Sequence, residues 1–138
     1  MAHSTFNKCV PSSATLAPEW CQAGHILWNK WIEGGKINDR QLKRTLICFI
    51  KEMKTRLYHF DVHPLSSEID LADANTRIAT VHLAYVSNAN YSTLSMAEHR
   101  AAAANYIFAA WKLTKKIFDE DHPCSRAIWT EFENVSRH

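Results

Sequence analysis

Apolar residues recur at helical spacing between positions 38 and 60 of the chain. They follow one another three or four positions apart, at Leu42, Leu46, Phe49, Met53, Leu57 and Phe60. This spacing places them on one side of an α-helix, with Ile50 at the margin. Asn38 is a residue type that caps helix N-termini, and Gln41 completes a capping box with it. The stretch therefore predicts an amphipathic helix that begins at Asn38 and ends near Asp61, because Pro64 disfavours a helical conformation at His63.

Similar patterns predict four further helices, over residues 17–33, 67–87, 96–118 and 123–135. Gly34 and Gly35 end the first, because glycine readily adopts the left-handed conformation of a helix C-cap. The short link that follows favours an antiparallel hairpin with the helix at 38–60. The apolar arc of the helix at 67–87 is broad, which predicts a central helix packed on two sides.

The composition agrees with a helical globular protein. Hydrophobic residues make up 46% of the 138 residues and charged residues 22%, as is ordinary for such proteins. Three glycines and four prolines are too few for the many turns of a β-sandwich or β-barrel. We predict an all-α fold, a single-domain bundle of about five helices over residues 17–138. Residues 1–16 are polar and interrupted by Pro11, which predicts an extended, flexible N-terminal lead-in.

Charge is unevenly distributed along the chain. The net charge is only +2, but residues 1–60 hold nine Lys/Arg against four Asp/Glu, whereas residues 61–138 hold seven against ten. The first part is thus strongly basic and the second acidic. A molecule with this polarity can bind a polyanion with one end or associate head to tail with other copies of itself. We therefore expect a homo-oligomer.

The predicted helix at 38–60 has a one-signed charged face. At 100° per residue its cations fall within an arc of roughly 100° and span roughly 20 Å of helix, and Asp39 and Glu52 lie off this arc. The cations are Arg40, Lys43, Arg44, Lys51 and Lys54, with Lys36 extending the row. An ordinary solvated helix face is one interpretation, but such faces usually mix both signs. An unmixed row is typical of a surface that binds anions.

Two pairs of residues have metal-ligand chemistry at helical spacing. Cys21 and His25 are four residues apart in the first helix, and His59 and His63 are four apart at the end of the second. An antiparallel hairpin could bring the pairs to one end of the bundle, where they would suit zinc. The spacing matches no common zinc-finger pattern, so ordinary polar or core residues are the alternative. We expect no resident cofactor, and zinc is the metal that these residues would hold.

The sequence contains none of the common catalytic motifs that we sought. It contains no glycine-rich phosphate loop, no HExxH and no nucleophile elbow. The acidic run at 119–121 beside His122 is typical of a solvated turn, and His82 on an apolar face is typical of a hydrogen-bonded core histidine. The sequence therefore predicts a protein that is not an enzyme. A metal-dependent enzyme using the zinc candidates is the remaining alternative.

These observations favour a non-enzymatic interaction or self-assembly module, such as an adaptor, a viral accessory protein or an effector. The basic residues would bind a protein partner or another copy. The alternative is sequence-independent binding of RNA or another nucleic acid through the same residues. No signal peptide or membrane span is found, so we expect no membrane partner and an intracellular location, cytoplasmic or nuclear, in the producing cell or a host. The four cysteines would there be reduced thiols.

Overall fold

The computed structural model describes residues 16–58, 64–88 and 96–137, and these form five α-helices without any strand. The helices are α2 (Leu16–Glu33), α3 (Asp39–Tyr58), α4 (Pro64–Ser87), α5 (Met96–Phe118) and α6 (Pro123–Ser136). The all-α bundle predicted from the sequence is thus confirmed. Of the predicted N-terminal lead-in, residues 1–15 lie outside the described part and Leu16 already belongs to α2. None of the described helices has the length and apolar character needed to cross a membrane.

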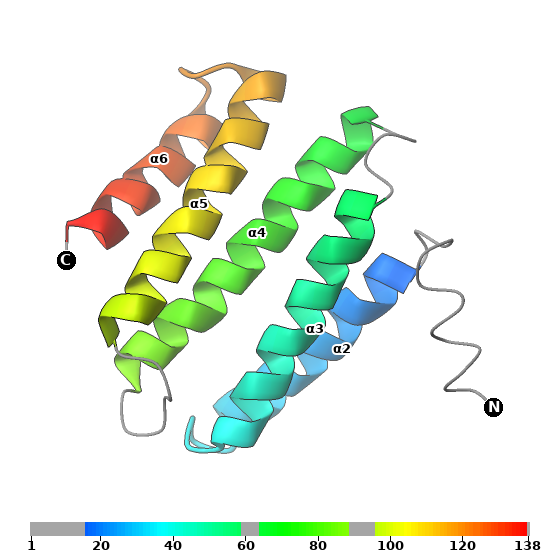
Figure 1. Cartoon of the computed structure of the whole chain (residues 1–138), viewed down its shortest axis with the longest axis vertical. Helices are drawn as coiled ribbons and strands as arrows, with labels where there is room; N and C mark the ends of the chain where they lie inside the picture. Colours follow the sequence, from blue (N-terminus) through cyan, green and yellow to red (C-terminus); the bar gives the residue numbers. More distant parts are fainter. Residues whose placement is uncertain (1–15, 59–63, 89–95, 138) are drawn as a thin grey trace.

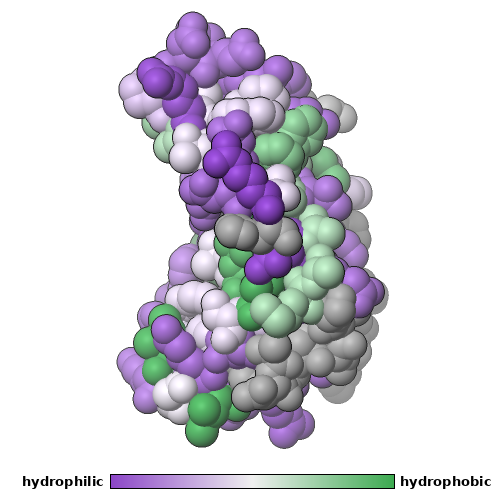
Figure 2. Space-filling view, turned by 90° about the vertical axis from the view of Figure 1, so that its left-hand side faces the viewer, coloured by the Kyte–Doolittle hydropathy of each residue, from purple (hydrophilic) through white to green (hydrophobic). Residues whose placement is uncertain are grey.

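Each helix packs chiefly against its neighbours in sequence, and consecutive helices run antiparallel (Figure 1). In this view α5, α4 and α3 stand side by side, α6 lies on the outer side of α5, and α2 lies behind α3. The predicted hairpin of α2 and α3 is therefore present. Seen from the side of α6, apolar residues form separate patches among hydrophilic ones (Figure 2).

The hydrophobic core has two parts that share α4. On one side, Ile78, Val81, Ala84 and Tyr85 pack with Trp31 of α2 and with Leu42 and Phe49 of α3. On the other side, Ala79 of α4 packs with α5 and α6 through Ala103, Ile107 and Val135. Burial of apolar surface on both sides is what the broad apolar arc of this segment predicts. The helix α4 is accordingly the central element of the fold.

Local contacts fix the helix ends. At the start of α3 the backbone N–H of Gln41 donates to Oδ1 of Asn38 at 3.2 Å, which is the predicted N-cap. After α2, Gly35 adopts a left-handed conformation with φ 85°, and Lys36 follows with φ 62°. After α5, Asp119 is left-handed at φ 66°. Its N–H donates to the carbonyl of Lys115 at 3.0 Å, so the chain turns where the acidic run begins.

Two sequence-based expectations are wrong in detail. The helix α4 begins at Pro64, three residues before the predicted start, because proline fits the first turn of a helix, where its missing N–H has no partner to lose. Leu57, predicted to be a core residue of α3, is 55% exposed. Phe60, the last predicted apolar position, lies outside the described residues.

Candidate partner-binding surface

The predicted cations lie on the exposed side of α3. Arg40, Lys43, Arg44, Lys51 and Lys54 are all exposed, and we call these five residues the basic face. Among the described residues, none of the five forms an ion pair with a carboxylate. The ammonium of Lys51 instead lies 5.3 Å from the centre of the Trp20 ring of α2. The basic face therefore presents positive charge that no described carboxylate pairs with.

Lys36, which was predicted to extend this row, lies in the link between α2 and α3. Its side chain is exposed, and its ammonium is 6.0 Å from the centre of the buried Trp31 ring. The left-handed backbone at this position turns the chain out of α2. Lys36 thus belongs to the turn that precedes α3 rather than to the helix itself.

An apolar side chain sits within the basic face. Ile47 is 46% exposed, three residues after Arg44 and four before Lys51. Residues three and four apart are neighbours on a helix surface, so Ile47 lies between the cations of the two ends of the face. Tyr58, four residues after Lys54, is 65% exposed at the end of the same helix. The surface thus combines positive charge with exposed apolar groups.

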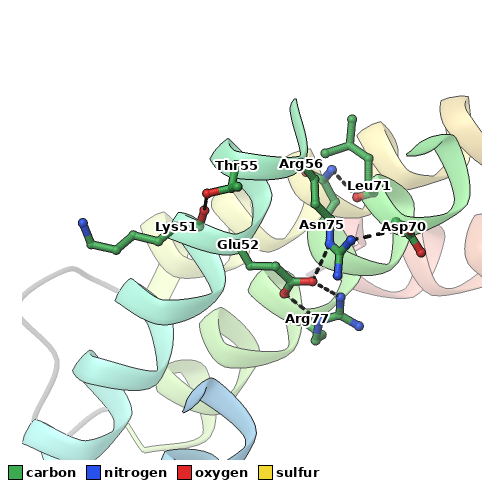
Figure 3. Close-up of polar contacts among 8 residues, drawn as sticks. All are labelled: Lys51, Glu52, Thr55, Arg56, Asp70, Leu71, Asn75 and Arg77. Atoms are coloured by element: carbon green, nitrogen blue, oxygen red, sulfur yellow. Dashed lines mark hydrogen bonds and ion pairs between the residues drawn. The ribbon is translucent and has the colours of Figure 1, made fainter. Parts of the chain in front are cut away.

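The opposite side of α3 contains a fully buried carboxylate. Glu52 is 0% exposed and accepts a hydrogen bond from Arg56 Nε at 2.8 Å and one from Arg77 Nε at 3.0 Å (Figure 3). Arg77 Nη2 also donates to Oε2 of the same carboxylate. Asp70 adds a looser contact, with its carboxylate 3.5 Å from Arg56 Nη1. Two guanidinium groups therefore satisfy one carboxylate, and Arg77 comes from α4.

This cluster, with the buried Leu42 and Phe49, orients α3 about its axis. Figure 3 shows the side chains of Lys51 and Glu52, neighbours in the sequence, pointing in different directions. Separating a buried carboxylate from its two arginine partners costs free energy. This cost holds α3 with Glu52 toward α4. The basic face consequently points outward. The helical pattern by itself placed Glu52 off the basic arc without predicting its burial. The signal for burial was its position three residues after the core residue Phe49, with Arg56 four residues further on.

The described metal candidates have other partners. The half-buried thiol of Cys21 faces the carboxylate of Glu52; burial, and then the negative charge of Glu52, raise the pKa of Cys21. The exposed His25 packs its ring edge against Phe49, with ring centres 5.3 Å apart. His59 and His63 lie outside the described residues. Within the described part of the chain, no three His, Cys, Asp or Glu side chains group to hold a metal.

A second polar pair is buried between α4 and α5. Nδ1 of His82 and Nδ1 of His99 are 2.9 Å apart, so one nitrogen carries the proton and the other accepts it. Tyr85 stacks on His99, with ring centres 4.4 Å apart, and Tyr106 stacks on His82 at 5.9 Å. Burial, and next the charge of His99, lower the pKa of His82 to about 4; burial also lowers the pKa of His99. His82 is thus the hydrogen-bonded core histidine predicted from the sequence.

The polar groups of α3 therefore have two different roles in the structure. The buried carboxylate of Glu52 is satisfied internally, whereas the basic face and Ile47 are open to solvent. An exposed row of cations around an apolar side chain can bind an anionic surface. Comparison of the chain with protein-family models, with curated proteins and with solved structures gives no significant match.

Proposed function

We propose that this protein is a non-enzymatic binding module that holds an acidic surface of a partner protein through the basic face of α3. The observation that carries the proposal is the exposed Ile47 among cations that no described carboxylate neutralises. Cations attract and orient an acidic partner, while a central apolar side chain gains free energy when the partner covers it.

The same cations could bind the phosphates of a nucleic acid, and Ile47 is what favours a protein. Phosphate contacts are made by charged and polar groups, so a phosphate backbone gains little from an aliphatic side chain at the centre of its binding surface. Protein interfaces, in contrast, bury apolar groups at the centre and leave charged groups at the rim. Covering the exposed part of Ile47 would contribute about 1 kcal/mol, or about a fivefold change in affinity.

Fluorescence anisotropy with two labelled probes tests the proposal. One probe is a peptide of about 20 residues, rich in glutamate with interspersed leucines, and the other is an RNA duplex of similar length. We expect the peptide to bind, the double variant Lys43→Glu/Arg44→Glu to weaken it at least tenfold, and Ile47→Ala to weaken it about fivefold. Lys30→Glu and Ile26→Ala, at exposed positions of α2, are the matched controls.

Other outcomes have distinct meanings. The proposal would be replaced by nucleic-acid binding if the RNA bound more tightly than the peptide and Ile47→Ala left RNA binding unchanged. The logarithm of the RNA binding constant would then fall with the logarithm of the salt concentration with a slope of about −3 to −5. Size-exclusion chromatography with light scattering at several protein concentrations tests whether the partner is a second copy. Self-association that Lys43→Glu/Arg44→Glu abolishes would identify the acidic surface as the protein's own.

A further inference from the structure

An apolar groove runs beside the basic face. It lies over α4 between α3 and α5 and has a volume of about 420 Å³. Apolar side chains from all three helices line it, among them Met53 and Leu57 of α3, Leu71 of α4 and Leu113 of α5. Leu57 is 55% exposed, so the groove is open to solvent at the position where the sequence predicted a core residue.

Lysines line the α5 side of this groove, and a further lysine neighbours its α3 side on the helix surface. On the α5 side, Lys112 and Lys116 are part of its lining and lie one helical turn apart. Lys116 is 3.6 Å from the carboxylate of Glu68, and the Lys112 ammonium is 5.3 Å from the centre of the Phe108 ring. On the α3 side, Lys54 of the basic face precedes Leu57 by three residues and is therefore its neighbour on the helix surface. Glu68 offsets one of these positive charges, so the rim remains net positive.

We propose that the groove receives an acidic amphipathic helix of the partner protein. This inference rests on the proposed function and specifies the partner segment. A helix places apolar residues at positions i, i+3, i+4 and i+7 on one side, which suits the apolar lining from three helices. Acidic residues that flank this stripe would reach Lys54 on one side and Lys112 and Lys116 on the other. The groove thus supplies the apolar contacts and its rim the charge complementarity.

Lysines on both sides distinguish this occupant from a fatty acid. A fatty acid carries a single carboxylate, which would neutralise lysines on one side only, whereas an acidic helix carries carboxylates along both edges of its apolar stripe. Lys112 and Lys116 are about 6 Å apart along α5, which equals the spacing of acidic residues four apart on a bound helix. The arrangement therefore favours a peptide helix.

The test uses two labelled peptides of identical composition, each of about 18 residues. In the first, leucines at i, i+3, i+4 and i+7 form one stripe flanked by glutamates; in the second, the order is scrambled so that no stripe forms. We expect the first to bind at least about tenfold more tightly by anisotropy. Leu57→Asp and Lys112→Glu should each weaken it by about tenfold, while Ile26→Asp and Lys30→Glu on α2 should leave it unchanged. Circular dichroism melts verify that every variant folds.

Each remaining outcome is decisive. Equal binding of the two peptides, or unchanged binding by Leu57→Asp, would overturn the groove assignment. If the peptides bind equally and Lys43→Glu/Arg44→Glu abolishes that binding, the groove inference fails while the proposed function stands. If neither peptide binds, the groove inference and the proposed function both fail. Binding of palmitate that is sensitive to Leu57→Asp, without binding of the striped peptide, would assign the groove to a fatty acid instead.

Discussion

Arg77 of α4 donates two hydrogen bonds to the buried carboxylate of Glu52 on α3, one of them from Nε at 3.0 Å. Arg56 donates a third from within α3. Because rotation of α3 about its axis would break the two bonds from Arg77, this interior contact helps to determine which side of α3 faces the solvent. This buried cluster and the buried apolar residues of α3 together keep the basic face toward the solvent.

Replacing Glu52 should destabilise the fold strongly. Glu52→Gln leaves two guanidinium groups facing a neutral amide, and we expect the free energy of unfolding to fall by about 3 kcal/mol. Urea denaturation measures this change. Glu33→Gln, at an exposed position of α2, is the control and should stay within about 0.5 kcal/mol of the wild type. A loss below about 1 kcal/mol for Glu52→Gln would show that the cluster contributes little to stability.

The histidine pair should make stability depend on pH. Burial lowers the pKa of His82 from its ordinary 6.5 to about 4, so the unfolded chain binds more protons than the folded protein between these values. The contribution of His82 to the free energy of unfolding is therefore fully present above pH 6.5. It is lost as the pH drops toward 4, which lowers the free energy of unfolding by about 3 kcal/mol. Burial also lowers the pKa of His99, and the negative charge of Glu98 offsets part of that shift. His99 therefore also makes the protein less stable at low pH.

Urea denaturation at a series of pH values measures this dependence. His82→Gln keeps a hydrogen-bonding side chain but removes the titrating ring, so the fall in stability between pH 6.5 and pH 4 should be smaller than in the wild type. His25→Gln is the matched control, because His25 is exposed on α2. Carboxylates contribute equally to all three proteins. If the stability of His82→Gln fell with pH as much as that of the wild type, His82 would not be the source of the pH dependence.

Gly24 marks the close approach of α2 and α3. A methyl group at this position would lie 2.7 Å from Cδ1 of the buried Phe49 ring, far inside van der Waals contact. Overpacking costs about 1–3 kcal/mol, whereas alanine gains about 1 kcal/mol in helix propensity. Thermal or urea unfolding of Gly24→Ala should therefore show a net loss of about 1 kcal/mol.

Two further variants separate crowding from other effects of Gly24→Ala. The double variant Gly24→Ala/Phe49→Leu should lose less stability than the sum of its single substitutions, because the smaller side chain relieves the contact. Gln22→Ala, at an exposed position of the same helix, should leave stability within about 0.5 kcal/mol of the wild type. Additive losses would mean that the ring does not obstruct the methyl group.

Thiol reactivity should differ among the described cysteines. Burial raises the pKa of Cys48, and burial followed by the charge of Glu52 raises the pKa of Cys21, so both thiols are protonated at neutral pH. Cys124 is exposed at the start of α6. Iodoacetamide at pH 7.5 should modify Cys124 about tenfold faster than the other two, as peptide mass spectrometry over time would show. Equal rates for Cys48 and Cys124 would mean that α3 opens readily.

Helical periodicity was sufficient to predict most of the architecture. The spacing of apolar residues predicted α5 with the observed bounds, and it predicted α2, α6 and the start of α3 within one residue. The predicted end of α3 lies outside the described residues. The two-sided packing of α4 also followed from its broad apolar arc. These features depend on residues close together in the chain, which is why the sequence reveals them. The exposure of Lys43 and Arg44 follows in the same way.

The candidate site was predicted only in part. Periodicity placed the cations together on α3, but it also placed Leu57 in the core, because a helical wheel does not show where a neighbouring helix leaves a groove open. The burial of Glu52 depends on Arg77, which is 25 residues away. Likewise, the partner of His82 is His99, 17 residues away. No local pattern contains these pairings.

The sequence by itself determined that the chain forms amphipathic helices, which segments these are, and which residues share a side of each helix. It could do so because the backbone geometry of a helix fixes the angle between successive side chains. Only the tertiary structure decided that Glu52 of α3 pairs with Arg77 of α4, which apolar residues of α3 stay exposed, and that lysines of α5 line one groove with Leu57 of α3. These outcomes depend on contacts between distant segments, where packing and ion pairing select one arrangement among many that the same helices could adopt.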